Sequence, residues 1–136
     1  KLKEAQDYVK QVPYHPISWT TLGNAQLNQK KYFDALSSFK KALTLDKNFQ
    51  NAREGLANTY REMGDLPNAI SEYKYLMNSN PQNTIYPYNL TIMYLKNNKT
   101  EEAINFLNEY VKTNPDALKA QNIKELYDEL NKQPKQ

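Results

Sequence analysis

The sequence contains no cysteine, one histidine and only three glycines in 136 residues. Without cysteine it can hold neither a disulfide framework nor a thiolate metal site. The compartment stays open between the cytoplasm, the periplasm and a membrane-anchored parent protein. No apolar run approaches the ~18 residues that a membrane-spanning helix needs, so direct membrane insertion is not expected. Low glycine content indicates an ordered chain that favours helices.

The sequence also has little excess of positive over negative charge. The formal net charge is +3, and lysines are scattered among acids rather than gathered into a stripe. Proteins that bind nucleic acid normally concentrate their basic residues on one face. We therefore expect no nucleic-acid partner, and the length of the chain predicts one domain.

What the sequence does have is a repeat. Ala35, Ala69 and Ala103 are equally spaced along the chain, and a bulky residue follows each alanine by four positions (Phe39, Tyr73 and Leu107). A further apolar pair comes one turn later, so the apolar residues of each segment share one helical face. The segments stop at equivalent places, Asp46-Lys47, Asn80-Pro81 and Asn114-Pro115. In the last two, the proline cannot continue a helix.

A second helical segment precedes each alanine, with turn residues between the two helices, as in Met63-Gly64-Asp65. Thr100, followed by two glutamates, predicts the N-cap of the third alanine-bearing helix. Helices joined by a short turn pack antiparallel and need small residues where they cross. We expect Gly23 to face Ala35 in this way.

This unit of helix, turn and helix resembles the tetratricopeptide repeat (TPR) family. "WTTLG" at residues 19–23 is similar to the opening of the family signature, "LANTY" and "LTIMY" match its later Leu and Tyr, and Pro81 and Pro115 match its terminal proline. The resemblance implies an all-α fold, a right-handed superhelical α-solenoid of antiparallel helix pairs. Three full repeats are expected at 16–49, 50–83 and 84–117.

The two ends predict partial units. Residues 1–15 fit the frame as the second helix of a preceding repeat and its turn, with an apolar face that a longer chain would cover. Residues 118–136 are expected to form a capping helix and a tail, because Leu118–Leu130 is amphipathic, with Ile123, Leu126, Tyr127 and Leu130 on one side and charges on the other. Such a helix suits the polar cap of a solenoid, followed by a frayed tail.

The resemblance also predicts where a partner binds, on the exposed face of the first helix of each repeat, which lines a concave groove. The residues on this face are Thr20, Asn24, Leu27 and Asn28 in the first repeat, Glu54, Asn58 and Arg61 in the second, and Tyr88, Ile92 and Leu95 in the third. Asn24 and Asn58 occupy equivalent positions, where a carboxamide can both donate to and accept from a peptide backbone.

The apolar face formed by Tyr88, Ile92 and Leu95 has two interpretations. The C-terminal helix could fold back onto it, as an all-round apolar helix requires. Alternatively, it could receive the apolar anchor of a partner.

No convergent set of nucleophile, base and charge stabiliser is evident, and His15 lies in a turn between prolines. We therefore expect no enzyme activity and no cofactor. The function predicted is a protein-interaction scaffold that binds a peptide or helix of a partner as part of a larger assembly. The alternative is self-association into a homo-oligomer through the N-terminal half-repeat or the Tyr88, Ile92 and Leu95 face.

Overall fold

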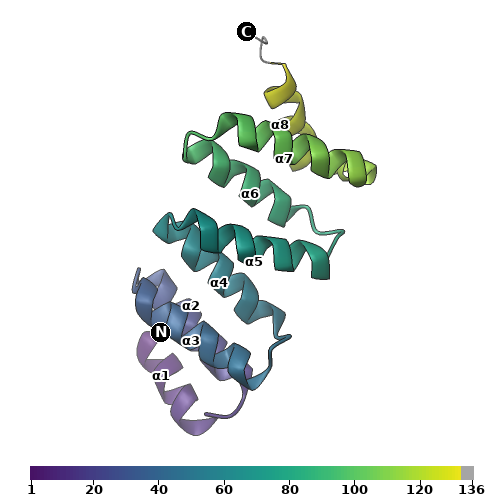
Figure 1. The fold of residues 1–136 in the computed structure, drawn as a ribbon. Helices are drawn as coiled ribbons and strands as arrows, with labels where there is room; N and C mark the ends of the chain where they lie inside the picture. Colours follow the sequence, from purple (N-terminus) through teal and green to yellow (C-terminus); the bar gives the residue numbers. More distant parts are fainter. Residues whose placement is uncertain (133–136) are drawn as a thin grey trace. The chain divides into compact units, whose positions relative to one another are not determined.

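The computed structural model describes residues 1–132, and this part of the chain is helical throughout (Figure 1). The elements are α1 (Leu2–Gln11), α2 (Pro16–Asn28), α3 (Tyr32–Leu45), α4 (Gln50–Met63), α5 (Leu66–Ser79), α6 (Ile85–Lys96), α7 (Thr100–Thr113), a 3-10 helix η1 (Pro115–Lys119) and α8 (Gln121–Asn131). The prediction of an all-α fold built from antiparallel helix pairs is confirmed. The expected frayed end at 133–136 lies outside the described residues.

The sequence repeat is reproduced in the helix bounds. Helices α3, α5 and α7 are each 14 residues long, and they begin at Tyr32, Leu66 and Thr100. The alanines of the repeat, Ala35, Ala69 and Ala103, are each the fourth residue of their helix and are completely buried. The three alanines therefore share one helix position and one degree of burial, in agreement with their equal spacing.

The turn inside each repeat has one backbone geometry. Lys30, Gly64 and Asn98 occupy equivalent positions of the three repeats, and they adopt φ values of 60°, 75° and 60°. In each case the next backbone N–H donates to the carbonyl five residues earlier, at 2.9 Å (Lys31 to Gln26, Asp65 to Tyr60 and Lys99 to Tyr94). This is the hydrogen bond of a Schellman motif, which ends a helix and reverses the chain.

The chain divides into two compact units, Lys1–Glu72 and the residues from Tyr73 onward. In the first unit α2 packs against α3, and α4 contacts both of them. Phe39 of α3 lies at the centre of this packing and is 0% exposed. A Cβ at Gly23 would lie 2.6 Å from the Phe39 ring, and a Cβ at Gly55 only 2.3 Å from it. We had predicted that Gly23 makes room for Ala35. The side chain that needs the space is instead the Phe39 ring.

Trp19 joins the first turn to α3. Its indole N–H donates to the carbonyl of Pro13 at 2.8 Å, and the Nζ of Lys41 lies 6.0 Å from its ring centroid. In the equivalent position of α4, Arg53 donates to Glu72 at 3.2 Å and to the carbonyl of Lys47 at 3.2 Å. At this position, the second repeat therefore has an arginine held by polar contacts where the first repeat has Trp19.

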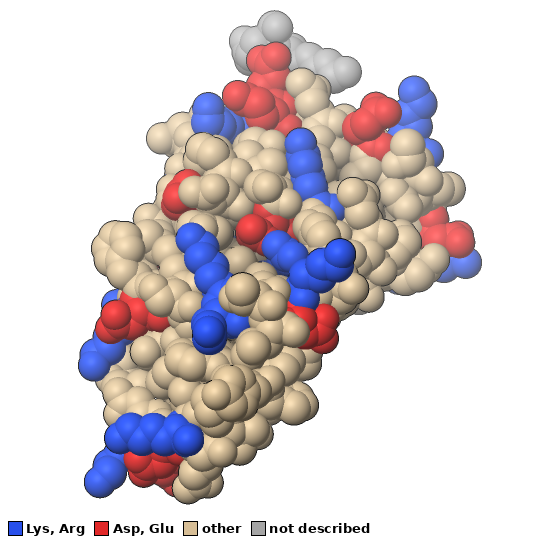
Figure 2. Space-filling view, turned by 60° about the horizontal axis from the view of Figure 1, so that its bottom comes forward, with Lys and Arg blue, Asp and Glu red and all other residues tan. Residues whose placement is uncertain are grey.

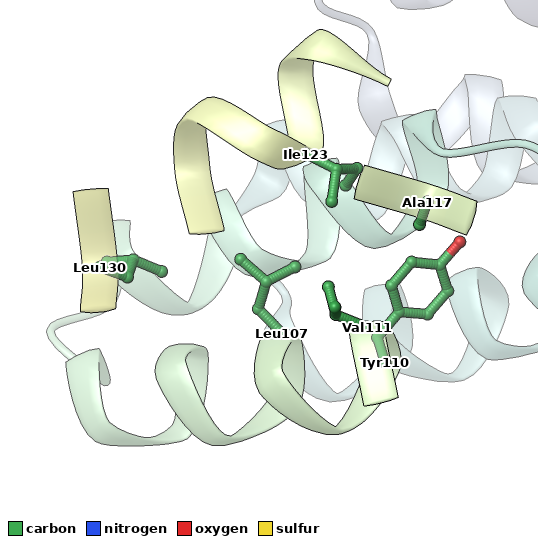
Figure 3. Packing of buried hydrophobic residues seen from close by; sticks show 6 residues of the cluster. All are labelled: Leu107, Tyr110, Val111, Ala117, Ile123 and Leu130. Atoms are coloured by element: carbon green, nitrogen blue, oxygen red, sulfur yellow. The ribbon is translucent and has the colours of Figure 1, made fainter. Parts of the chain in front are cut away.

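The second unit is built around a cluster of buried residues from α7, η1 and α8, six of which are drawn in Figure 3 (Leu107, Tyr110, Val111, Ala117, Ile123 and Leu130). Leu126 and Tyr127 pack against this cluster, whereas Lys124, Glu125, Asp128 and Glu129 are exposed. The expected amphipathic C-terminal helix is confirmed. Its start differs slightly, because η1 separates α7 from α8.

The start of α7 also differs from the prediction. Lys99 occupies the N-cap, its side chain makes no capping hydrogen bond, and Thr100 is already the first helical residue. Glu101 and Glu102 do lie in the first turn, where the helix dipole favours acidic side chains.

Candidate partner-binding groove

A groove of about 310 Å³ lies between α2 and α4 in the first unit. Its lining residues are Ile17, Thr20, Thr21 and Asn24 of α2, Asn51, Glu54, Gly55 and Asn58 of α4, and Phe49 just before α4. Apart from Phe49, the groove consists of the same four positions taken from two successive repeats. These positions have the spacing i, i+3, i+4 and i+7, which is one face of a helix.

Four of the predicted site residues meet in this groove: Thr20, Asn24, Glu54 and Asn58. Asn24 is exposed and Asn58 is half-buried, so two equivalent carboxamides line one hollow. Each carboxamide can pair with both the N–H and the C=O of a peptide. The arrangement can therefore hold an extended backbone without demanding a particular sequence.

Thr20 lies in the groove differently from the expectation. Its side chain is 5% exposed, and its hydroxyl donates to the carbonyl of Pro16 at 2.8 Å. Because this donor already has a partner inside the helix, Thr20 forms part of the groove's floor rather than a contact that selects a ligand.

The remaining chemistry of the groove is apolar and acidic. Ile17 is 44% exposed, and Phe49 is half-buried. Glu54, also half-buried, is the charged side chain among the lining residues. A ligand with an apolar side chain for Ile17 and Phe49 and a basic one for Glu54 would complement these walls.

The other predicted positions of the first unit lie elsewhere. Asn28 lines a second groove, between α1 and α2. Leu27 is half-buried, and a guanidinium nitrogen of Arg61 lies 3.8 Å from the Glu62 carboxylate. None of these three belongs to the groove between α2 and α4.

Sequence reasoning missed Ile17, Thr21, Phe49, Asn51 and Gly55. The repeat does make 17 and 51 equivalent positions, as it does 21 and 55, but it does not show which turn of the helix face lines a groove. We had extended the binding face from Thr20 toward the end of α2. The observed groove follows the same helix face one turn toward its start.

In the second unit, Tyr88 and Leu95 of α6 pack against the buried cluster of α7, η1 and α8. Helix α6 also contacts α8 directly. The first of the two interpretations of this face, in which the C-terminal helix folds back, therefore describes Tyr88 and Leu95. Ile92 is half-buried.

Comparison with protein families identifies the repeats. A model described as tetratricopeptide repeat matches residues 16–49, and a second model of the same description matches residues 60–126. The two matches together cover well over half of the chain.

The chain belongs to the tetratricopeptide repeat family.

Repeats of this family are in general protein–protein interaction modules, and its scaffolds are typically non-catalytic. No curated protein matches the sequence.

Solved structures show the same fold at low sequence identity. MamA (residues 41 to the end) from Desulfovibrio magneticus RS-1 is 18% identical with a TM-score of 0.73, and the match covers 96% of this chain and 72% of that one. A thermophilic TPR protein from Thermus thermophilus is 15% identical with a TM-score of 0.70, with 97% and 72% covered. YrrB, described as a TPR protein with an unusual peptide-binding site, is 19% identical with a TM-score of 0.66, with 85% and 60% covered.

Residues 1–132 contain neither a metal-binding cluster nor a membrane-spanning helix. No group of three or more His, Cys, Asp and Glu residues there could hold a metal ion. Across residues 1–132, no helix has the length and apolarity to cross a bilayer. Figure 2 shows Lys and Arg side chains interspersed with Asp and Glu over the face in view.

Proposed function

We propose that the chain is a protein-interaction scaffold whose groove between α2 and α4 holds an extended peptide segment of a partner protein. The observation that carries this proposal is the meeting of Asn24 and Asn58 in one groove with Ile17 and Phe49. The carboxamides suit a peptide backbone, and the apolar pair suits one large side chain.

The charge of the groove adds a preference. Glu54 lines the groove together with Asn24 of α2 and Asn58 of α4. A Lys or Arg of the ligand would pair with this carboxylate, whereas an acidic ligand would be repelled. The expected ligand is therefore a segment with one large apolar and one basic side chain.

The proposal is tested by selecting binders from a displayed library of random peptides and measuring their affinity for variants. Ile17→Asp places a charge on the apolar wall and is expected to weaken binding by about tenfold or more. Glu54→Gln is expected to weaken only peptides that carry Lys or Arg, by about threefold.

Phe33→Asp is the matched control for Ile17→Asp. Phe33 is 78% exposed on α3, so the substitution makes the same change of charge away from the groove. Peptides that bind Ile17→Asp as tightly as the wild type, or that lose affinity equally for Phe33→Asp, would contradict the proposed site.

A further inference from the structure

A hollow of about 390 Å³ lies in the second unit, between the end of α5 and α7. Among its lining residues are Asn78 of α5, Pro81 just after α5, and Phe106, Glu109 and Tyr110 of α7. We call it the α5–α7 hollow. It shares no residue with the groove between α2 and α4.

The first repeat shows how the side chain at position 19 is held. The indole N–H of Trp19 donates to the carbonyl of Pro13, six residues earlier, at 2.8 Å. Lys41, on the second helix of the same repeat, has its Nζ 6.0 Å from the centroid of the indole ring. Trp19 therefore lies between a turn carbonyl and a side chain of α3.

The second repeat has an arginine at the equivalent position. The Arg53 guanidinium donates to the carbonyl of Lys47, again six residues earlier, and to the Glu72 carboxylate, both at 3.2 Å. Glu72 lies on α5, the second helix of this repeat. Both repeats thus use a flat side chain with N–H donors, and both hold it by a turn carbonyl and a side chain of the following helix.

The partners of these two side chains have equivalents in the third repeat, and all of them line the α5–α7 hollow. They are Pro81, equivalent to positions 13 and 47, Phe106, equivalent to position 72, and Glu109, equivalent to position 41. The residue at the position of Trp19 and Arg53 is Pro87, which is fully buried and has no N–H to donate. Because Pro87 is short and buried, it does not reach the partners that line the hollow.

These partners are available to a ligand. The carbonyl of Pro81 accepts no hydrogen bond within residues 1–132. The Glu109 carboxylate is exposed, and it forms no ion pair with the other residues of that range. Phe106 is half-buried, and its ring stacks on Tyr110 with the centroids 6.4 Å apart. The hollow therefore presents a hydrogen-bond acceptor, a negative charge and an aromatic ring.

An arginine side chain matches all three groups. Its guanidinium is flat, carries five N–H donors, pairs with carboxylates and stacks on aromatic rings. Lysine offers a compact charge without the flat surface, and tryptophan has one N–H and no charge for Glu109. Arg53 already shows the combination in the second repeat, where it joins a turn carbonyl to a carboxylate.

We propose that the α5–α7 hollow binds an arginine side chain of a partner protein, which takes the place that Trp19 and Arg53 have in the earlier repeats. The site goes beyond the peptide groove of the first unit and does not depend on it. Helices of the chain both precede and follow the residues of the hollow, so the hollow does not arise at an end of the sequence.

Three blocked tripeptides test the proposal: acetyl-Gly-Arg-Gly-amide and the same peptide with lysine or citrulline in place of arginine. Each is titrated into the protein and followed by backbone amide NMR shifts, which report affinity and position. The arginine peptide should shift the amides of Asn78, Phe106 and Glu109. We expect it to bind about threefold more tightly than the lysine peptide and about fivefold more tightly than the citrulline peptide, which keeps the flat shape but has no charge.

Variants of the hollow separate its contributions. Glu109→Gln should weaken the arginine peptide about fivefold, and Phe106→Leu should weaken it about threefold. Glu101→Gln is the matched control for Glu109→Gln, because Glu101 is an exposed glutamate of the same helix outside the hollow. Pro87→Arg supplies a guanidinium from the chain itself and should abolish binding. If Pro87→Arg fails to fold, Glu109→Gln and Phe106→Leu still decide the test.

Equal affinity for the arginine and lysine peptides, or equal losses in Glu101→Gln and Glu109→Gln, would overturn the proposal, because a general attraction of positive charge would explain both. Shifts confined to α2 and α4 would place the arginine in the other groove and would also contradict it. Glu54→Gln should leave binding at the hollow unchanged, so each of the two sites can fail without the other. Concentration-dependent sedimentation that Glu109→Gln abolishes would make a second copy the occupant, against the proposal.

Discussion

The ring of Phe39 occupies the space that a side chain at Gly55 would need, with Cε1 only 2.3 Å from the position of a Cβ. Phe39 lies on α3 and Gly55 on α4, so the two residues fix how closely these helices approach. Gly23 accommodates the same ring from α2. One fully buried aromatic side chain therefore depends on two glycines from two other helices.

Gly55→Ala should destabilise the protein, although alanine is the better helix former. The gain in helix propensity is about 1 kcal/mol, whereas overpacking a filled core costs about 1–3 kcal/mol. Urea denaturation measures the difference. Combining Gly55→Ala with Phe39→Leu should cost less than the sum of the two single variants, because the smaller side chain relieves the contact. Strict additivity would show that the contact is not the cause.

Lys30→Gly should stabilise the first unit by about 0.5–1 kcal/mol. Lys30 adopts φ 60°, in the left-handed region, whereas the equivalent turn of the next repeat uses Gly64. Gly64→Ala is the reverse exchange and should destabilise by a similar amount. No atom lies within 4 Å of a Cβ at Gly64, so backbone strain alone would be responsible. Thermal denaturation of both variants checks the prediction, and a Lys30→Gly protein that melts lower than wild type would contradict it.

Glu72→Ala should destabilise the first unit by about 1–3 kcal/mol, because it leaves the Arg53 guanidinium without its carboxylate in a partly covered site. The side chains of Arg53 and Glu72 are 20% and 17% exposed. The double variant Arg53→Met, Glu72→Leu should recover most of the loss, because both charges are removed together. A double variant as unstable as Glu72→Ala would mean that the ion pair is not what matters. Chemical denaturation of the wild type, Glu72→Ala and the double variant measures these differences.

Two tyrosines of the second unit predict a loss of stability at alkaline pH. Burial raises the pKa of Tyr94, with a further rise from the nearby Glu102 carboxylate, and burial alone raises the pKa of Tyr110. Above pH 10 the unfolded chain releases these protons before the folded chain does. The unfolded state then binds fewer protons, so stability is complete below pH 10 and falls as the pH rises through the folded pKa values.

The double variant Tyr94→Phe, Tyr110→Phe should keep more of its stability as the pH rises above 10 than wild type does. Both rings face Phe106, at centroid distances of 6.1 and 6.4 Å, and phenylalanine preserves these contacts. Tyr14→Phe, on a side chain that is 86% exposed, is the control. Urea midpoints measured across this pH range decide the matter, and parallel curves for wild type and the double variant would refute it.

The sequence predicted the features that depend on residues close together in the chain. The spacing of Ala35, Ala69 and Ala103 gave the period, and the residues after each helix gave its end. Gly55 was missed, because its role comes from an aromatic ring on a different helix, and nothing in the residues around Gly55 indicates that ring. The exact residues that line the groove were also missed. Helix periodicity shows which face of α2 and α4 is exposed, but not at which turn the two helices leave a groove between them.

The apolar face of α6 illustrates the same limit. The sequence predicted that Tyr88 and Leu95 need a cover, and it left open whether the C-terminal helix or a partner provides it. The choice depends on where η1 and α8 turn after α7, which is a tertiary property. The binding residues themselves stay a prediction until a ligand is measured.

Trp19 is the one tryptophan of the chain, and it lies in the first unit with its indole bonded to Pro13 and close to Lys41. Its fluorescence consequently reports on that unit alone, whereas circular dichroism records the helices of both units. Comparing the two signals during denaturation would reveal whether the units melt as one cooperative body or in succession. Trp19 is thus an intrinsic fluorescent probe of the first unit, and no added dye is needed.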